Sequence, residues 1–380
     1  MAFKCSPIMS AMRGAALVVA LSACGFTPQG ASDAALGSGD GGGPRDAPAD
    51  TTTSSNWLTG YHYRKPITVT AAATLVDFPL GVQRVKDHDL AAHANGDDLV
   101  VTGADGITPL DRELVTSLVD GTIELWVRVT LAPGAQTFYL YYGGASGVNS
   151  RSMWSAMTGV WHLSDPMMTA ADSSPHAHTL AATGPMQTPM AKPGVAGNAR
   201  SYDGVDDSFG IADPSDGSLD VGTSSFSFTL WVKSTAAGMY DTPLWKGGTS
   251  TAEPGYCLIT GTQFWNVKIH DGTTYVDPEL GTAAQLTNQW VHVAGVVDRT
   301  AHTFAGYANG ALAQALPITG VTSLDNNFAF DIGRPNNGVF KGLVDEVRIY
   351  PRALSADWIA AEYANLATPS FEVFGAEQMH

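Results

Sequence analysis

Alternating apolar and polar positions predict that this chain is built mainly of β-strands. Between Ile123 and Val129 the aliphatic residues occupy every second position, and Glu124, Trp126 and Arg128 lie between them. This period of two is typical of a half-buried strand in an antiparallel sheet. The stretches 226–232 and 290–294 alternate in the same way, and Gly, Asp and Asn punctuate the chain between such runs. We therefore predict an all-β protein.

The predicted strands fall into two segments, which we interpret as two β-sandwich domains. In residues 57–147 we expect strands at 63–69, 78–82, 98–101, 123–129 and 137–142. In residues 153–376 the strands are numerous enough for two packed sheets of jelly-roll type. Ser355 is a suitable N-cap for one short C-terminal helix over 356–366. Ile359, Tyr363 and Leu366 would hold this helix against the sandwich, and 371–374 is a candidate edge strand.

The N-terminal region has the pattern of an exported protein. Residues 1–23 contain Arg13, an apolar run at 15–20 and the sequence Leu-Ser-Ala before Cys24. This looks like a bacterial lipoprotein signal peptide, which would make Cys24 the lipidated first residue of the mature chain. The alternative is a signal peptide without lipidation. Residues 24–56 are rich in Gly, Ala, Ser, Thr and Pro, and we predict a disordered tether there.

Composition narrows the classes of function. The net charge of −16 argues against a nucleic acid partner. After removal of residues 1–23, Cys257 is the only cysteine besides Cys24, so no internal disulfide is expected and stability must come from core burial or a bound metal.

Asp345 stands out because the period of two places it on the same face as Leu343, Val347 and Ile349. An unpaired buried charge is costly, so such a carboxylate is expected to be hydrogen-bonded, paired or bound to a metal. The same period places Glu346 on the opposite face.

The stretch at 341–350, the turn at 202–207 and the strand at 290–294 together resemble the laminin-G-like branch of the concanavalin A-like lectin/glucanase superfamily over residues 153–376. The resemblance implies a structural Ca²⁺ held by Asp345, with the turn at Asp203 and Gly204 supplying carbonyl groups. Asp172, Asp206 and Asp207 are weaker candidates as ligands. The alternative is that Asp345 accepts hydrogen bonds from neighbouring amides and binds no metal. The segment 57–147 resembles an uncharacterised bacterial β-domain that often precedes a laminin-G-like module, which implies no known chemistry.

The motifs that would indicate an enzyme are missing from the sequence. The glucanases of this superfamily carry Glu-x-Asp-x-(x)-Glu on one strand, and none of the glutamates has this spacing. His-Glu-x-x-His and Gly-x-Ser-x-Gly are also absent. His176 and His178 could share a face and bind a transition metal, but the sequence shows no third ligand near them. Cys257 is interpreted as a small core residue.

A binding function is the remaining interpretation, since sandwich lectins stack sugar rings on Trp or Tyr. We predict Trp245 and Trp265 as surface aromatics and Asn336 as a hydrogen-bonding partner, against the alternative that the indoles are core residues and Asn336 only forms a turn. The hypothesis is a non-catalytic, lectin-like or adhesin-like lipoprotein of the outer membrane or cell surface that recognises a polysaccharide or surface protein. A glycoside hydrolase or polysaccharide lyase on the same fold, and a structural spacer of the envelope, are the alternatives.

Overall fold

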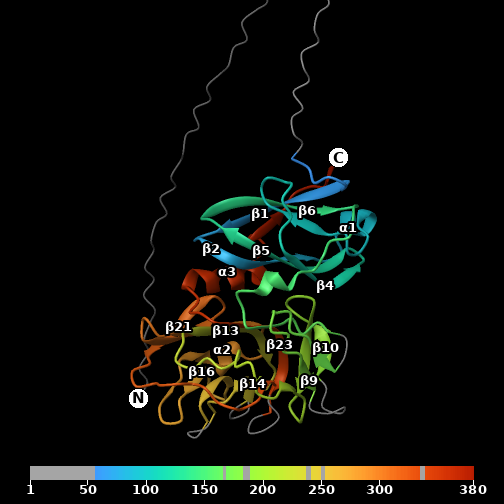
Figure 1. Cartoon of the computed structure of the whole chain (residues 1–380). Coiled ribbons are helices and arrows are strands. Elements are labelled where there is room, and N and C mark those ends of the chain that lie inside the picture. Colours follow the sequence, from blue (N-terminus) through green and yellow to red (C-terminus); the bar gives the residue numbers. More distant parts are fainter. Residues whose placement is uncertain (1–55, 166–167, 183–188, 237–240, 250–252, 334–338) are drawn as a thin grey trace, which may run out of the picture. The chain divides into compact units, whose positions relative to one another are not determined.

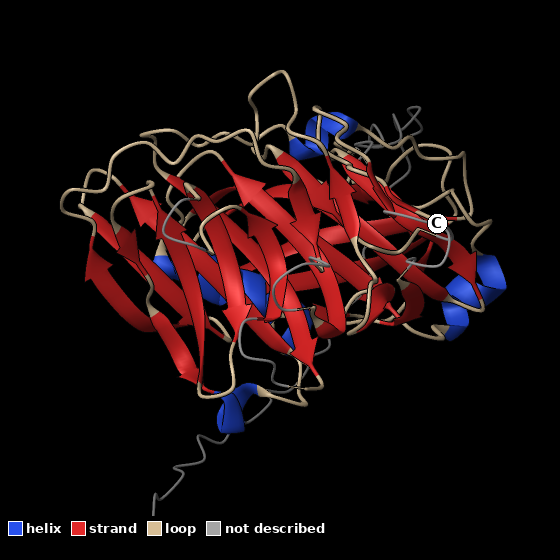
Figure 2. Cartoon of the chain, turned by 90° about the horizontal axis from the view of Figure 1, so that it is seen from below, coloured by secondary structure: helices blue, strands red, loops and turns tan. Residues whose placement is uncertain are grey.

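The computed structural model describes residues 56–165, 168–182, 189–236, 241–249, 253–333 and 339–380. Strands make up most of the ribbon, and the helices are short (Figure 2). The all-β prediction is confirmed, and every strand pairing between the named strands is antiparallel. No helix in the described part of the chain combines the length and the apolar character that crossing a membrane requires. Cys24, the predicted signal peptide and almost all of the predicted tether lie outside the described residues.

Two sheets are built mainly from the N-terminal segment (Figure 1). The five-stranded sheet has the order β24 (Glu372–Phe374), β1 (Tyr63–Ala71), β6 (Gly134–Tyr142) and β3 (Val100–Thr102), and β25 (Gln378–Met379) also pairs with β1. The three-stranded sheet has the order β2 (Leu75–Arg84), β5 (Thr122–Leu131) and β4 (Arg112–Val119). The predicted edge strand at 371–374 is therefore present, and it extends the N-terminal sheet.

Two larger sheets form the C-terminal sandwich. The eight-stranded sheet has the order β10 (Met190–Pro193), β11 (Asn198–Asp203), β23 (Lys341–Tyr350), β13 (Phe226–Ser234), β19 (Val291–Asp298), β20 (Thr303–Ala308) and β21 (Ala311–Pro317), and β7 (Gly159–Trp161) pairs with β23. The nine-stranded sheet has the order β17 (Tyr275–Val276), β16 (Phe264–His270), β15 (Gly255–Thr260), β14 (Asp241–Lys246), β22 (Phe330–Ile332), β12 (Phe209–Ile211), β9 (Leu180–Ala182) and β8 (Thr169–Ala170), and β18 (Glu279–Thr282) pairs with β16.

The helices are α1 (His88–His93), the 3-10 turn η1 (Arg151–Trp154), α2 (Ala283–Leu286) and α3 (Ala356–Ala367). Helix α3 is the predicted C-terminal helix, and the Ser355 hydroxyl accepts a hydrogen bond from the Trp358 amide at 3.2 Å. The helix contacts both strand groups, between which it lies in Figure 1. Its Trp358 ring packs against Phe78 of β2, and its Tyr363 ring stacks on Trp231 of β13.

Two main hydrophobic cores result from this arrangement. One lies within the sandwich and includes Val293 and Val344. The other joins the N-terminal sheets to α3 and to residues of the eight-stranded sheet, including Val296 and Tyr350. The eight-stranded sheet is therefore covered on both faces, which explains why β19 is apolar almost throughout. Packing continues across the predicted domain boundary, and residues 54–380 form one compact unit.

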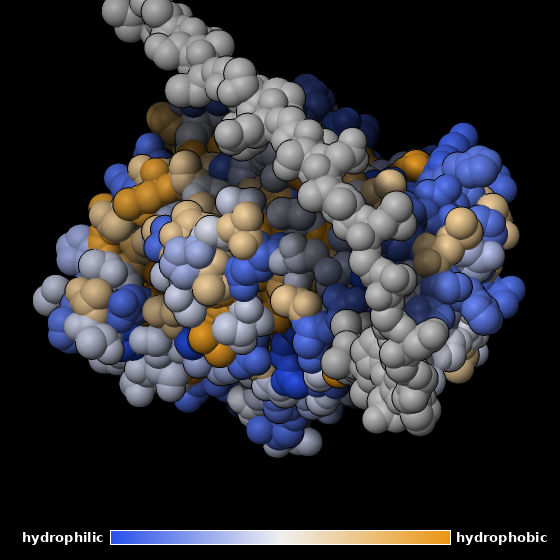
Figure 3. Space-filling view, turned by 90° about the horizontal axis from the view of Figure 1, so that it is seen from above, coloured by the Kyte–Doolittle hydropathy of each residue, from blue (hydrophilic) through white to orange (hydrophobic). Residues whose placement is uncertain are grey.

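Among the described residues, several large apolar side chains are exposed to solvent. Val119 and Val148 are examples, with exposed fractions of 70% and 81%. On the face shown in Figure 3, hydrophobic and hydrophilic residues are interspersed. Single exposed apolar residues are ordinary for a folded protein.

Candidate functional site

Asp345 lies beside a β-bulge that changes the predicted register of its strand. Opposite β13, Trp231 pairs with Asp345 and Thr229 with Arg348, so two residues of β23 face one residue of its neighbour. Glu346, within the bulge, has a φ of +49°. Val344, Val347 and Ile349 line the sandwich core, whereas Tyr350 joins the core shared with the N-terminal segment. The prediction that Asp345 shares a face with Val347 and Ile349 was therefore wrong.

The Asp345 carboxylate is fully buried, and only one of its two oxygens accepts hydrogen bonds. Its Oδ2 atom accepts hydrogen bonds from the amides of Val195 at 2.6 Å and Ala196 at 3.1 Å, whereas Oδ1 has no hydrogen-bond partner among the described residues. Burial, followed by the negative charges of Glu346 and Glu124, holds the pKa of Asp345 well above its usual range. A cation would relieve this repulsion.

These residues fit a metal ion in part. The unpartnered Oδ1 atom is a free hard donor, and a Cβ added at Gly194 would lie 2.3 Å from Asp345 Oδ2, so glycine allows the backbone to approach the carboxylate closely. Asp345 and the backbone near Gly194 would hold the ion.

Asp203 and Gly204 do not join this group. Asp203 pairs with Lys341, four residues before Asp345 along β23, and Gly204 packs against the Lys341 side chain. Asp203 Oδ1 accepts a hydrogen bond from the Val205 amide at 2.7 Å, and Asp207 Oδ2 accepts one from the Asp203 amide at 2.9 Å. The predicted pairing of this turn with Asp345 was wrong, because the carboxylates close the turn locally.

Asp172 is also satisfied by the protein itself. Its oxygens accept hydrogen bonds from the amides of Val160, Ser174 and His178 at 2.8–2.9 Å, and from the Ser174 hydroxyl at 2.8 Å. This side chain organises a loop and leaves no donor directed at a metal.

A buried network around His162 lies where the N-terminal segment contacts the sandwich. His162 Nδ1 is 2.8 Å from Glu346 Oε1 and 3.7 Å from Glu124 Oε1 of β5, and its Nε2 is 3.5 Å from Glu113 Oε2 of β4. Burial disfavours the imidazolium, but the charges of Glu346 and Glu113 outweigh it and hold the pKa of His162 well above its usual range. A positively charged His162 therefore bridges acids from three strands.

Arg348 extends this network toward α3. Its guanidinium contacts Glu346, and its Nη1 donates to Glu362 Oε1 of α3 at 2.7 Å. It also lies over the Trp126 ring at 4.4 Å from the centroid. The sequence interpretation missed this network. The available signal was the pairing of Glu124 and Trp126 on the polar face of β5, which we expected to be solvated.

Three residues of the network are almost closed to solvent. The exposed fractions of Glu124 and Glu346 are 1% each and that of His162 is 4%. Burial and the nearby Glu346 raise the pKa of Glu124 to about 7, and His162 and Ser164 oppose that rise. Glu113 is more accessible than these residues, and with His162 and Ser164 it lines a pocket of about 160 Å³. The buried carboxylates join the two parts of the fold.

The two predicted surface indoles are not on the surface. Trp265 is fully buried in the sandwich core, and Trp245 is 5% exposed beside Cys257 and Ile259. These residues cannot stack on a sugar ring without rearrangement, because both sheet faces at these positions are covered. Cys257 is buried, as expected of a core residue. Asn336 lies outside the described residues.

A groove beside β16 combines the features that the indoles were expected to provide. It encloses about 410 Å³, and we call it the β16 groove. Its lining includes Thr262, Gln263, Phe264, Asn266, Lys268 and Asp277. In β16 the side chains of Phe264, Asn266 and Lys268 alternate with the buried Trp265, Val267 and Ile269. The period of two thus places an aromatic ring, an amide and an ammonium group along one partly exposed side of the strand.

The polar groups of the β16 groove are oriented by their neighbours. The Asn266 amide donates to the Asp277 carbonyl oxygen at 3.3 Å. Lys268 Nζ lies 4.9 Å from the centroid of Tyr275, whose exposed fraction of 54% makes it the second exposed aromatic near this strand. Partial burial raises the pKa of Asp277, and the charge of Lys268 opposes that rise. The groove can accept and donate hydrogen bonds beside the Phe264 ring.

Part of the sandwich matches a known protein family. A laminin-G type model described as the concanavalin A-like lectin/glucanases superfamily matches residues 203–360. This confirms the resemblance over that range, which is narrower than the predicted 153–376. The comparison with curated proteins gives no match.

Solved structures that match this chain include binding domains of clostridial toxins. The binding domain of Paraclostridial Mosquitocidal Protein 1 is 15% identical, with a TM-score of 0.45, and the match covers 54% of this chain and 52% of that one. The receptor binding domain of botulinum neurotoxin C/D mosaic serotype is 14% identical, with a TM-score of 0.45 and coverages of 55% and 51%. The botulinum neurotoxin serotype D ligand binding domain, solved in complex with N-acetylneuraminic acid, is 13% identical, with a TM-score of 0.45 and coverages of 55% and 50%. The chain thus spans about half the length of each of these structures.

Proposed function

We propose that this protein binds a polysaccharide without catalysis, through the β16 groove. The observation that carries the proposal is the exposed side of β16, where Phe264, Asn266 and Lys268 line one open groove together with Asp277. Protein sites for small ligands commonly have a volume of about 300–1,000 Å³ and a few placed polar groups, which this groove matches. The match of residues 203–360 to a lectin-containing superfamily supports the same class of function.

The chemistry of the groove suits sugar hydroxyls. A pyranose ring presents an apolar C–H face that packs on an aromatic ring, and Phe264 is 38% exposed for such a contact. The Asn266 amide and the Asp277 carboxylate can then pair with hydroxyl groups on the ring edge. The missing Glu-x-Asp-x-(x)-Glu motif and the burial of the His162 network favour binding over hydrolysis.

The setting that we propose for this activity is the cell surface. Lipidation at Cys24 would anchor the chain to a membrane, and residues 24–56 would carry the folded part away from it, so that the groove meets extracellular glycans. A structural calcium ion at Asp345 would stabilise β23 and would take no part in sugar recognition. These three elements rest on the sequence pattern and on the unpartnered Asp345 oxygen.

A glycan array probed with the whole mature chain tests the proposal. We expect retention on one class of polysaccharide, and loss of that retention in the F264A/N266A double variant. The control is L312A, which removes an exposed apolar side chain from β21 in the other sheet. L312A should bind like the unaltered protein. The proposal fails if the unaltered protein is retained on no glycan, or if F264A/N266A is retained as strongly as L312A.

A further inference from the structure

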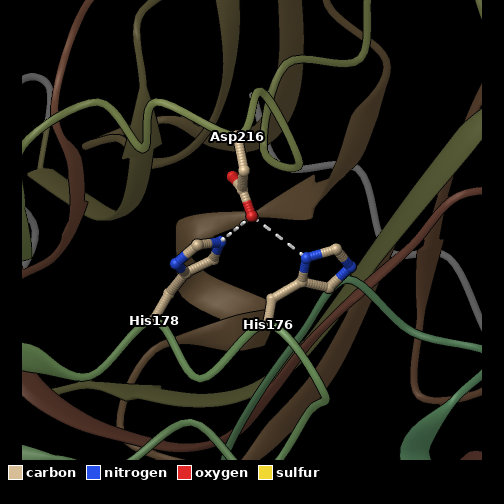
Figure 4. Close-up of side chains that lie close together, drawn as sticks. All are labelled: His176, His178 and Asp216. Carbon is tan, nitrogen blue, oxygen red and sulfur yellow. Dashed lines mark hydrogen bonds and ion pairs between the residues drawn. The ribbon is translucent and has the colours of Figure 1, made fainter.

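Two histidines and one aspartate from separate loops meet at the surface of the sandwich. His176 and His178 lie in the loop between β8 and β9, and Asp216 lies in the loop after β12 (Figure 4). Asp216 Oδ2 is 3.2 Å from His176 Nδ1 and 3.3 Å from His178 Nε2. One donor atom from each residue lies within 4.8 Å of the other two. The sequence offered no third ligand for the two histidines, because Asp216 is brought to them only by the fold.

The histidine loop is held in place by buried groups. Asp172, which is fully buried, accepts hydrogen bonds from the His178 amide and from Ser174, and the Ser174 hydroxyl accepts one from the His176 amide. The His178 carbonyl oxygen accepts a hydrogen bond from the Trp161 indole at 3.0 Å. Both histidines are thus positioned through their own backbone atoms.

The conformation of the loop also brings the two rings to the same side. Ala177, between the histidines, has a φ of +57°, which departs from an extended strand. The rings stack with centroids 5.6 Å apart and an interplanar angle of 23°. The two imidazoles consequently face the same carboxylate, as Figure 4 shows.

Asp216 is oriented by Ser218, whose hydroxyl also lies 2.5 Å from His178 Nε2. Its Oδ1 atom accepts hydrogen bonds from the Ser218 amide at 3.1 Å and the Ser218 hydroxyl at 2.8 Å. This leaves Oδ2 directed at the histidines. Supported ligands of this kind are typical of metal sites, in which outer hydrogen bonds set the orientation of each donor.

We propose that His176, His178 and Asp216 bind a divalent transition metal ion of the Zn²⁺ class. Two ligands that each lie about 2.0–2.1 Å from one tetrahedral ion are separated by about 3.3 Å, which matches the two nitrogen-to-oxygen distances here. His176, whose side chain is 36% exposed, can rotate to complete the set. Two imidazoles and one carboxylate suit zinc and copper, whereas Ca²⁺ and Mg²⁺ prefer oxygen ligands.

The proposed ion would join two loops and keep an open position. Three protein ligands leave a fourth tetrahedral position for water or an incoming ligand. The Asp216 side chain is 45% exposed, so that position faces solvent. The ion would join the β8–β9 loop to the loop before β13 (Phe226–Ser234). The three ligand atoms, one from each residue, already lie within 4.8 Å of one another.

Calorimetric titration of the EDTA-treated full chain with ZnCl₂ at pH 7.5 tests this inference. We expect one equivalent of Zn²⁺ to bind, and the affinity to fall at least about tenfold in each of H176A, H178A and D216N. Excess CaCl₂ should leave this binding unchanged, which separates it from the calcium proposed at Asp345. Replacement by Co²⁺ should produce the visible absorption of a tetrahedral nitrogen and oxygen site, and this absorption should be lost in H178A.

The matched control is H88A. His88 is 94% exposed and lies 3.4 Å from the Asp89 carboxylate, so it reproduces a histidine and aspartate pair without a second histidine. H88A should bind Zn²⁺ like the unaltered protein. The inference is overturned if H176A and H178A retain full affinity, or if no Zn²⁺ binding is detected, in which case the cluster is an ion pair only.

Discussion

His162 Nδ1 lies 2.8 Å from Glu346 Oε1, and both side chains are buried where the N-terminal strands meet the sandwich. The pair lies at the centre of a chain of charges that runs from Glu113 and Glu124 through His162 and Glu346 to Arg348 and Glu362. Removing one member of such a network leaves its partner as an uncompensated buried charge, which is much more costly than losing a surface ion pair.

We predict that H162Q lowers the free energy of unfolding by about 3–5 kcal/mol, the range for breaking a buried pair. Urea denaturation at pH 6 measures the change. The double variant H162Q/E346Q should lose less than the sum of the two single variants, because neither partner is then left charged alone. Strict additivity, or a loss in H162Q no larger than in H88A, would contradict the network.

The pH dependence of stability should contain a contribution from Glu372 on β24. Burial raises the pKa of Glu372 from 4.5 to about 8, and the Gln83 amide and Arg84 oppose this rise. Between about pH 4.5 and 8, Glu372 is therefore protonated in the folded chain and ionised in the unfolded chain. The free energy of unfolding consequently falls as the pH rises through this range.

E372Q should remove this component. We expect E372Q to be more stable than the unaltered protein at pH 9 by on the order of 2 kcal/mol, and to differ little from it at pH 4.5. Urea midpoints at the two pH values give the answer, with E279Q on the exposed face of β18 as control. An equal effect of E372Q at both pH values would show that the proton is not involved.

Calcium should stabilise the fold through Asp345. We expect excess CaCl₂ to raise the melting temperature of the EGTA-treated chain, because a ligand that binds only the folded state shifts unfolding toward higher temperature. D345N should melt at the same temperature with and without the ion. A melting temperature that EGTA and CaCl₂ leave unchanged, with no metal found in the purified protein, would refute the site.

The N-terminal segment should not fold without the C-terminal residues. Its core includes Trp358, Ile359 and Phe371, and β1 receives hydrogen bonds from β24 and β25. We expect a fragment of residues 56–150 to lack a cooperative unfolding transition by circular dichroism. Cooperative unfolding of this fragment would mean that 57–147 is an autonomous domain.

Local patterns were sufficient to predict much of the fold. The strand alternation at 123–129 and the Ser355 cap correspond to β5 and α3, because both depend on interactions within a few residues. The burial of the second face of β5 was not predictable in this way. Glu124 and Trp126 have the appearance of a solvated face until the residues around Trp154 and His162 cover them.

The site residues show the limits of a strictly periodic interpretation. The bulge at Glu346 shifts the register by one residue, so Asp345 and Glu346 do not lie on opposite faces of β23. Burial and the negative charge of Glu346 therefore both raise the pKa of Asp345. We predicted Trp265 as a surface aromatic, although the alternation of β16 places it with the buried Val267 and Ile269. Asp216 is far from the histidines in sequence, so only the three-dimensional structure identifies it.

The pairing of β1 with β24 and β25 also affects how the protein can be made. One edge of β1 stays without its native neighbours until residues 372–379 have left the ribosome, and an unpaired strand edge invites contact with other chains. A nascent chain therefore cannot complete its first sheet until these C-terminal residues have been synthesised.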